Sequence, residues 1–187
     1  MQAAAFNIRK QLPRNVLTKG KTMASDTVSY SVSQRILHWL VVALVFFNLL
    51  LPEGMEEWNR AVRQAGAATA EQVASANLHA YAGILIAILT IWRIVLRLTM
   101  KNPTLPVEEP PLFRLAAKAA HGLLYVLLLV LPLTGAGAYY LGNKQAGDFH
   151  GGPLKALLWL LIVAHVLGVL AHQFYWKTNV MKRMTVG

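Results

Sequence analysis

Long apolar runs alternate with shorter polar segments along this chain. Four runs stand out, at residues 36–51, 78–98, 115–141 and 154–176. The last three runs are long enough to cross a bilayer. The first run is long enough only if Ser33, Gln34 and Arg35 form its interfacial start. Lipid offers the backbone no hydrogen-bond partner, so the runs are expected to be helices. The pattern predicts an all-α transmembrane four-helix bundle, with helices at about 33–52, 77–99, 114–141 and 153–176.

The composition supports lipid as the solvent of this chain. Of its 187 residues, 56% are hydrophobic and 14% are charged, whereas about 25% are charged in a soluble domain. The chain has no cysteine, which excludes disulfides, zinc–thiolate sites and iron–sulfur clusters.

The net charge of +10 is unevenly distributed. Most Lys and Arg residues lie in the N-terminal segment, in or beside the second loop, and in the tail, whereas the first loop holds four glutamates against Arg60 and Arg63. Under the positive-inside rule, both termini and the second loop are predicted to be cytoplasmic. This placement also argues against a nucleic-acid partner, because no basic surface is interleaved with aromatic residues.

The first 29 residues are basic, contain no acid before Asp26 and show no apolar period. They are predicted to be a mobile arm, with residues 30–187 forming the membrane domain. Met23 is an alternative start of translation, and a basic arm without acids also has the composition of an organelle transit peptide.

Six histidines lie within or at the edge of the apolar runs: His38, His79, His121, His150, His165 and His172. Ionisable side chains inside membrane helices are expensive to bury and are usually functional. His150 and His165 are separated by roughly 22 Å along a continuous helix. The fourth helix therefore presents histidines at stacked depths, with partners on the first and second helices at an inner and an outer level.

Paired imidazoles at two depths favour two haem groups, whose iron would have both axial positions filled and would serve electron transfer. The spacing alone leaves the inner pairing open, because His38 could pair with His165, His172 or His121. A mononuclear metal site would require ligands that converge at one depth, so metal transport is less favoured. A bundle without a cofactor is a further alternative.

The surroundings of the histidines suit a flat macrocycle. Small residues would let a porphyrin, or equally another helix, approach the backbone; these are Gly83, Gly122, Gly135, Gly137 and Gly168. Cations at both levels could pair with haem propionates, or they could only determine the orientation of the chain in the membrane. They are Arg35, Arg93, Arg97 and Lys118 at the inner level and Lys144 and Lys155 at the outer level.

Several ordered segments resemble the prokaryotic cytochrome b561 family, which is related to the cytochrome b subunits of nickel hydrogenases and formate dehydrogenase. They are residues 30–40 (YSVSQRILHWL), 77–83 (NLHAYAG) with Trp92, Arg93 and Arg97, then 115–125 (LAAKAAHGLLY), 164–176 (AHVLGVLAHQFYW) and 182–185 (KRMT). The resemblance implies a four-helix protein of the bacterial inner membrane that binds two haem b groups.

The resemblance also implies roles for individual residues. His38 and His165 would ligate the cytoplasmic-side haem iron, and His79 and His150 the outer one. His121 and His172 would line a quinone pocket. Separately from the resemblance, Arg35 and Arg97 are predicted from their charge and position to contact haem. Two departures stand out. In the family the outer ligand lies fourteen residues before the inner one, but Gly151 occupies that position here, and Glu108 and Glu109 lie where some relatives carry lysine.

We therefore expect a cytochrome that transfers electrons between a donor and the quinone pool. Some relatives resemble superoxide oxidases that reduce ubiquinone. The alternative is a membrane-anchor subunit that passes electrons from a dehydrogenase or hydrogenase partner to quinone.

Overall fold

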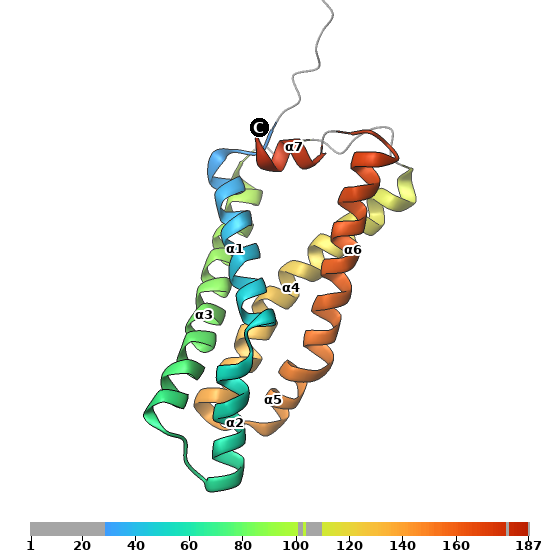
Figure 1. The fold of residues 1–187 in the computed structure, drawn as a ribbon. Coiled ribbons are helices and arrows are strands. Elements are labelled where there is room, and N and C mark those ends of the chain that lie inside the picture. Colours follow the sequence, from blue (N-terminus) through green and yellow to red (C-terminus); the bar gives the residue numbers. More distant parts are fainter. Residues whose placement is uncertain (1–28, 101–102, 104–109, 179, 187) are drawn as a thin grey trace, which may run out of the picture.

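The computed structural model of the chain describes residues 29–100, 103, 110–178 and 180–186. These residues form helices and no strand (Figure 1). The helices are α1 (Val32–Leu50), α2 (Glu53–Ala65), α3 (Ala70–Thr99), α4 (Pro111–Leu141), α5 (Lys144–Phe149), η3 (His150–Leu154), α6 (Lys155–Phe174) and α7 (Val180–Thr185). Residues 1–28 of the predicted arm, Met23 among them, lie outside the described residues, as do Glu108 and Glu109.

The predicted all-α class and the four spans are confirmed. Four helical stretches are long and apolar enough to cross a membrane: Val32–Leu50, Ala70–Thr99, Pro111–Leu141 and Lys144–Phe174. Their outer surfaces carry large apolar side chains, such as Leu98 and Leu133, which are 80% and 70% exposed. Lipid contact accounts for such exposure, because a soluble monomer rarely shows apolar patches of this extent.

Two helix starts differ from the prediction. The second spanning helix begins at Ala70, because Thr69 and Gln72 form a capping box that satisfies the first free backbone N–H groups. The fourth was predicted to begin at about residue 153, but helical structure begins at Lys144 and continues through the π-helical turn η3. Gly151, Gly152 and Pro153 therefore bend the fourth span and do not delay it.

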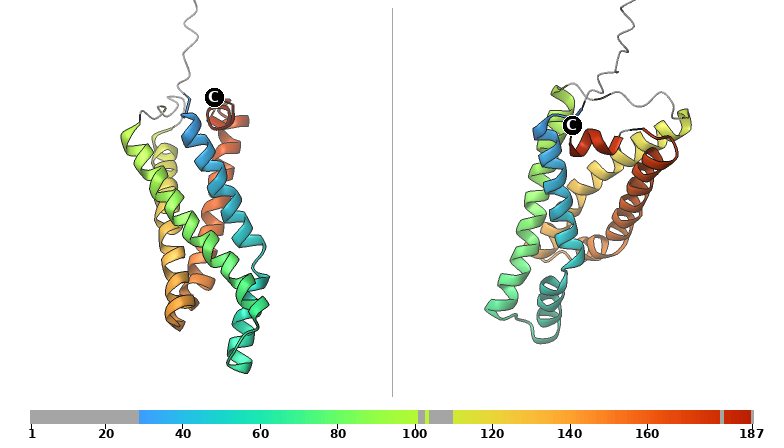
Figure 2. Two further views of the ribbon diagram at one scale, coloured as in Figure 1. Left: turned by 90° about the vertical axis from the view of Figure 1, so that its left-hand side faces the viewer. Right: turned by 45° about the horizontal axis from the view of Figure 1, so that its top comes forward.

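The first loop contains a helix that the apolar runs did not predict. In α2, Met55, Trp58 and Val62 recur at helical spacing between charged residues. The helix ends at Gly66, whose left-handed backbone (φ 72°) suits glycine. Figure 2 shows α2 beside the first turns of α3, on which it packs.

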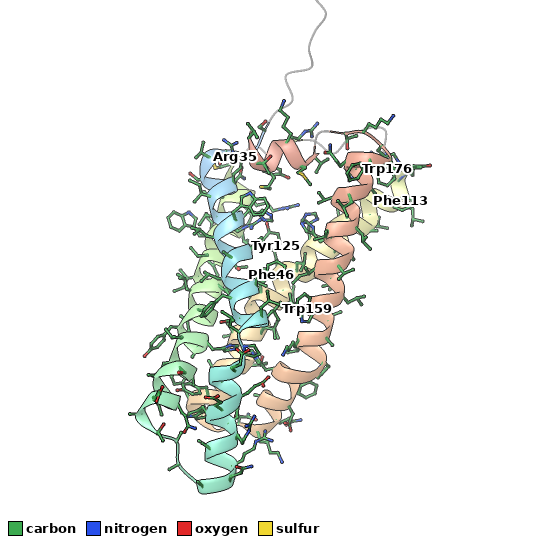
Figure 3. All side chains as sticks on the ribbon, in the orientation of Figure 1. Arg35, Phe46, Phe113, Tyr125, Trp159 and Trp176 are labelled. Atoms are coloured by element: carbon green, nitrogen blue, oxygen red, sulfur yellow. The ribbon has the colours of Figure 1, made fainter. Side chains whose placement is uncertain are left out.

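The spanning helices pack in sequence, α1 on α3, α3 on α4 and α4 on α6. A buried apolar layer takes side chains from all four: Val41, Val45, Ile86, Leu127, Leu131, Leu158 and Leu161. Helices α1 and α6 meet through long side chains, such as the rings of Phe46 and Trp159, whose centroids are 6.2 Å apart (Figure 3).

The two ends of the described chain lie at the same end of the bundle (Figure 1). The indole N–H of Trp39 donates to the Met184 carbonyl at 3.1 Å, and the Arg35 guanidinium donates to the Thr185 carbonyl at 3.3 Å. These bonds hold α7 against the start of α1. The cytoplasmic location of this end remains a prediction from the Lys and Arg distribution.

Candidate functional site

Two pairs of histidines face each other between the spanning helices. At one level, the ring centroids of His38 on α1 and His165 on α6 are 6.4 Å apart. At the other, the centroids of His79 on α3 and His150 on η3 are 6.1 Å apart. Along each helix the buried apolar layer lies between the two levels. We call them the inner pair and the outer pair, since α7 lies at the end of the bundle nearer the first.

The spacing of both pairs fits a metal ion held between imidazoles. Two imidazoles bound to opposite sides of one ion, through bonds of about 2 Å, have centroids about 6 Å apart. His121 is closer to His165, at 5.1 Å, which is shorter than this arrangement needs. Within the part of the chain that the structure describes, no group of three or more His, Asp or Glu side chains could hold a metal ion. The separation of the rings within each pair is therefore the separation expected of two imidazoles on opposite sides of one metal ion.

His150 is set for a ligand role by helix α4. Its Nδ1 lies 2.8 Å from the Leu131 carbonyl oxygen, which can only accept, so Nδ1 donates and Nε2 keeps its lone pair. Gly135 makes room for the ring, because a Cβ atom at that position would lie 2.9 Å from His150 Cε1. The sequence analysis predicts that a porphyrin or another helix approaches the backbone at Gly135. In the structure, the group that approaches it is the His150 ring.

The bend in the fourth span accounts for the unusual position of His150. Pro153 has no N–H group and cannot continue the regular hydrogen-bond pattern, and Gly152 takes a non-helical backbone (φ −102°, ψ −105°). The kink at Gly152 interrupts the regular rotation from one residue to the next. His150 therefore still faces His79, although it lies fifteen residues before His165.

The outer pair opens into a large cavity with about 1440 Å³ of empty space, part of it open to the surroundings. The buried layer contributes its inner wall through Val45, Ile86, Leu131 and Leu158. Near His79, the Asn48 side-chain amide donates to the His79 carbonyl at 3.2 Å. Among the described residues, His79 Nδ1 has no hydrogen-bond partner. This cavity has space and an available imidazole nitrogen for a bound group.

The inner pair has a different polar environment. The Arg93 guanidinium donates to His38 Nδ1 at 2.8 Å. Arginine can only donate, so a neutral His38 in this arrangement carries its proton on Nε2. Coordination of iron through Nε2 therefore requires that proton and the Arg93 contact to rearrange. Arg93 and Arg97 also lie over the Tyr125 ring, with guanidinium carbons 5.9 and 5.7 Å from its centroid.

The two histidines predicted to line a quinone pocket lie on different helices. His121 on α4 donates from Nδ1 to the Ala117 carbonyl at 2.7 Å and lies against His165. His172 on α6 is buried, and its Nδ1 lies 2.9 Å from the Thr178 hydroxyl. The structure thus brings His121 to the inner pair, and His172 lies two helical turns further along α6.

Of the remaining cations that the sequence predicts beside haem, one lines the outer cavity and the others do not. Arg35 contacts the C-terminal end of α7, as described above, and Lys155 lines the outer cavity. Lys144 and Lys118 are not among the cavity residues. Sequence reasoning missed the cavity residues on α2, chiefly Trp58 and Arg63, because the segment was taken for a loop. The helical spacing of Met55, Trp58 and Val62 was the signal that could have placed them.

Comparison with known proteins identifies relatives over almost the whole described chain. A family model described as prokaryotic cytochrome b561 matches residues 29–187. The chain is 32% identical over 159 residues to a cytochrome b562 of Cereibacter sphaeroides, covering 83% of this chain and 94% of that protein. It is 25% identical to a probable superoxide oxidase CybB of Yersinia pestis, covering 83% and 94% of the two chains. It is 26% identical to cytochrome b561 homolog 1 of Escherichia coli, covering 83% and 96%.

Proposed function

Because the chain belongs to the prokaryotic cytochrome b561 family, we propose that it holds two b-type haems in a bacterial inner membrane and passes electrons between a donor and the quinone pool. The observation that carries the proposal is the presence of two facing histidine pairs, with centroids 6.4 and 6.1 Å apart, at separate levels of one bundle. When bound, a haem held by two imidazoles supplies reversible one-electron chemistry without an open iron position.

In this proposal each spanning helix has a definite task. Helix α6, extended by η3, supplies one ligand to each level, while α1 and α3 supply the partners His38 and His79. The Leu131 carbonyl fixes the orientation and tautomer of His150, as second-shell acceptors do for metal-bound histidines. The buried apolar layer keeps water out of the space between the two levels.

We assign quinone binding to the inner end of the bundle, near His121 and His172. The Nδ1–H of His121 is engaged by the Ala117 carbonyl, which leaves Nε2 as an acceptor. Such a nitrogen can take a proton from, or return one to, a quinone oxygen. Arg35 and Arg97, at the same end, would then contact the inner haem.

The donor side of the proposal draws on one relative, the probable superoxide oxidase, at 25% identity. Superoxide is a one-electron donor, so two superoxide anions would become two dioxygen molecules while one quinone takes two electrons and two protons to become a quinol. Superoxide as the donor is a more specific proposal than electron transfer to the quinone pool.

The haem content of the purified protein tests the central claim. Wild type is expected to contain about two haems per chain, and His38→Ala or His79→Ala about one. His165→Ala and His150→Ala should lose the inner and the outer haem respectively. A His165→Ala variant that retains two haems with an unchanged reduced-minus-oxidised spectrum would refute the ligand scheme.

Kinetics test the assignment of the quinone site. His121→Ala and His172→Ala are expected to keep two haems, because neither residue is a proposed ligand, but to slow the reoxidation of reduced protein by ubiquinone. Unchanged reoxidation in both variants would overturn this assignment. Co-purification of a larger redox partner, with no activity toward superoxide, would favour the membrane-anchor alternative.

A further inference from the structure

Helix α2 forms part of the wall of the outer cavity. Met55, Glu56, Trp58, Asn59 and Arg63 all line the space into which His79 and His150 open. An arginine on the same helix, Arg60, is exposed and is not among the lining residues. The helix therefore turns one set of side chains toward the cavity and another away from it.

The position of α2 is set by close contacts with the spanning helices. A Cβ atom on Gly54 would lie 2.8 Å from the Ser75 Cβ of α3 and 3.1 Å from its carbonyl carbon, so only glycine permits this approach. The Trp58 ring packs edge-on against Tyr139 of α4, with centroids 4.7 Å apart. The Tyr139 hydroxyl in turn donates to Asn77 Oδ1 at 3.0 Å. These contacts tie α2 to both α3 and α4.

The charged groups of the cavity wall are two cations and one acid, Arg63, Lys155 and Glu56. Within the part of the chain that the structure describes, the side chains of Arg63 and Lys155 form no hydrogen bond or ion pair. Lys155 also lies near enough to His79 and His150 to interact electrostatically with both. A net positive wall around two imidazoles suits a ligand that is apolar in its body and anionic at its edge.

We propose that α2 completes the outer haem site and that Arg63, with Lys155, binds the carboxylates of the haem. The inference rests on the proposed function, since it assumes that haem occupies the outer level. Arg63 is exposed, as Arg60 is, but only Arg63 lines the cavity. A guanidinium binds a carboxylate through paired, charge-assisted hydrogen bonds. Helix α2 is then part of the cofactor site as well as a connection between two spans.

The test compares two forms of haem in one-site protein. Chains carrying His38→Ala, which should leave the outer level alone able to bind, are produced without haem and titrated with haem b or with its dimethyl ester. The ester keeps the iron and the ring but lacks the carboxylates. The readout is the dissociation constant from Soret absorbance, with Arg63→Gln as the test variant and Arg60→Gln as its matched control.

Arg63→Gln is expected to weaken haem b binding about tenfold or more, a typical effect of losing a charge-assisted hydrogen bond, while Arg60→Gln leaves it unchanged. Binding of the dimethyl ester should be equal in all three chains. A second variant, Gly54→Ala, displaces α2 and should weaken binding of haem b more than binding of the ester, because both forms contact the cavity wall but only haem b has carboxylates. Gly122→Ala, where an added Cβ meets nothing within 4 Å, is its control.

Each other outcome has a separate meaning. If Arg63→Gln and Arg60→Gln bind haem b equally, or if Arg63→Gln weakens the ester as much as haem b, the carboxylate role of Arg63 is overturned. If Arg63→Gln alters only the rate with an anionic donor, the cation serves a free anion and the inference is likewise overturned. If the parent chain binds neither form of haem, the proposed function itself fails.

Discussion

Gly135→Ala should remove the outer haem and leave the inner one in place. The added Cβ would lie 2.9 Å from His150 Cε1 and 3.1 Å from its Nδ1, two atoms of a ring anchored to the Leu131 carbonyl. Ordinary contact begins at 3.4 Å, so the ring must move away from the added methyl group. A ring displaced from its anchor on the Leu131 carbonyl no longer presents Nε2 in the same direction, so the substitution should weaken or abolish coordination of the outer haem by His150.

The assay is haem per chain together with the reduced-minus-oxidised spectrum of the purified variant. We expect a fall from about two haems to about one, with the signal of the inner haem unchanged. Alanine is a better helix former than glycine by about 1 kcal/mol, so general destabilisation of α4 would not explain the loss. Gly122→Ala, on the same helix and without close neighbours, is the control. Two haems and a normal spectrum in Gly135→Ala would show that His150 is not packed against α4 as a ligand.

Three further predictions follow from other contacts. Arg93→Gln should lower the midpoint potential of the inner haem by on the order of tens of millivolts, because removing a cation beside His38 favours the oxidised, more positive iron; an unchanged redox titration would exclude Arg93 from the inner site. Deletion of Gly152 should preserve the outer haem, whereas insertion of an alanine after Gly152 should abolish it, as judged by haem content. Trp39→Phe removes the bond to the Met184 carbonyl and should speed amide hydrogen exchange in α7, with Trp159→Phe as the control.

The membrane spans could be predicted because each is encoded by one long, uninterrupted run of apolar residues. About 20 apolar residues are needed to cross a bilayer, and no other structure satisfies the backbone there. Helix α2 was not predictable in the same way, since only three apolar side chains mark its inner face between glutamates and arginines. The predicted start of the fourth span was too late because Gly151, Gly152 and Pro153 usually mark the end of a helix, whereas here they form a kink between two helical segments of one span.

Helix spacing alone predicted the two levels of the site, whereas the pairing of His38 with His165 and of His79 with His150 was predicted only from the family resemblance. Positions along each helix fix the depth of a histidine to within a turn, so two levels could be derived from spacing alone. Which rings meet depends on how the helices are rotated and how far apart they lie. His121 illustrates this limit, because it lies closer to His165 than His38 does. Its bond to the Ala117 carbonyl is of the same kind as the bond of His150 to the Leu131 carbonyl, so only its short spacing argues against it as a ligand. Sequence could not provide these lateral distances.

The kink at Gly152 matters because one span must serve two partners on different neighbours. His165 faces α1 and His150 faces α3, so the angle between the two side chains around the fourth span must match the positions of those two helices. Fifteen regular residues at 100° place two side chains about 60° apart in one sense, whereas fourteen place them about 40° apart in the other. Because the non-helical backbone of Gly152 already interrupts the regular rotation, deletion of Gly152 should be tolerated. An inserted residue would instead rotate His150 by about a further 100°, away from His79 and toward lipid, where no partner on α3 could share an iron with it.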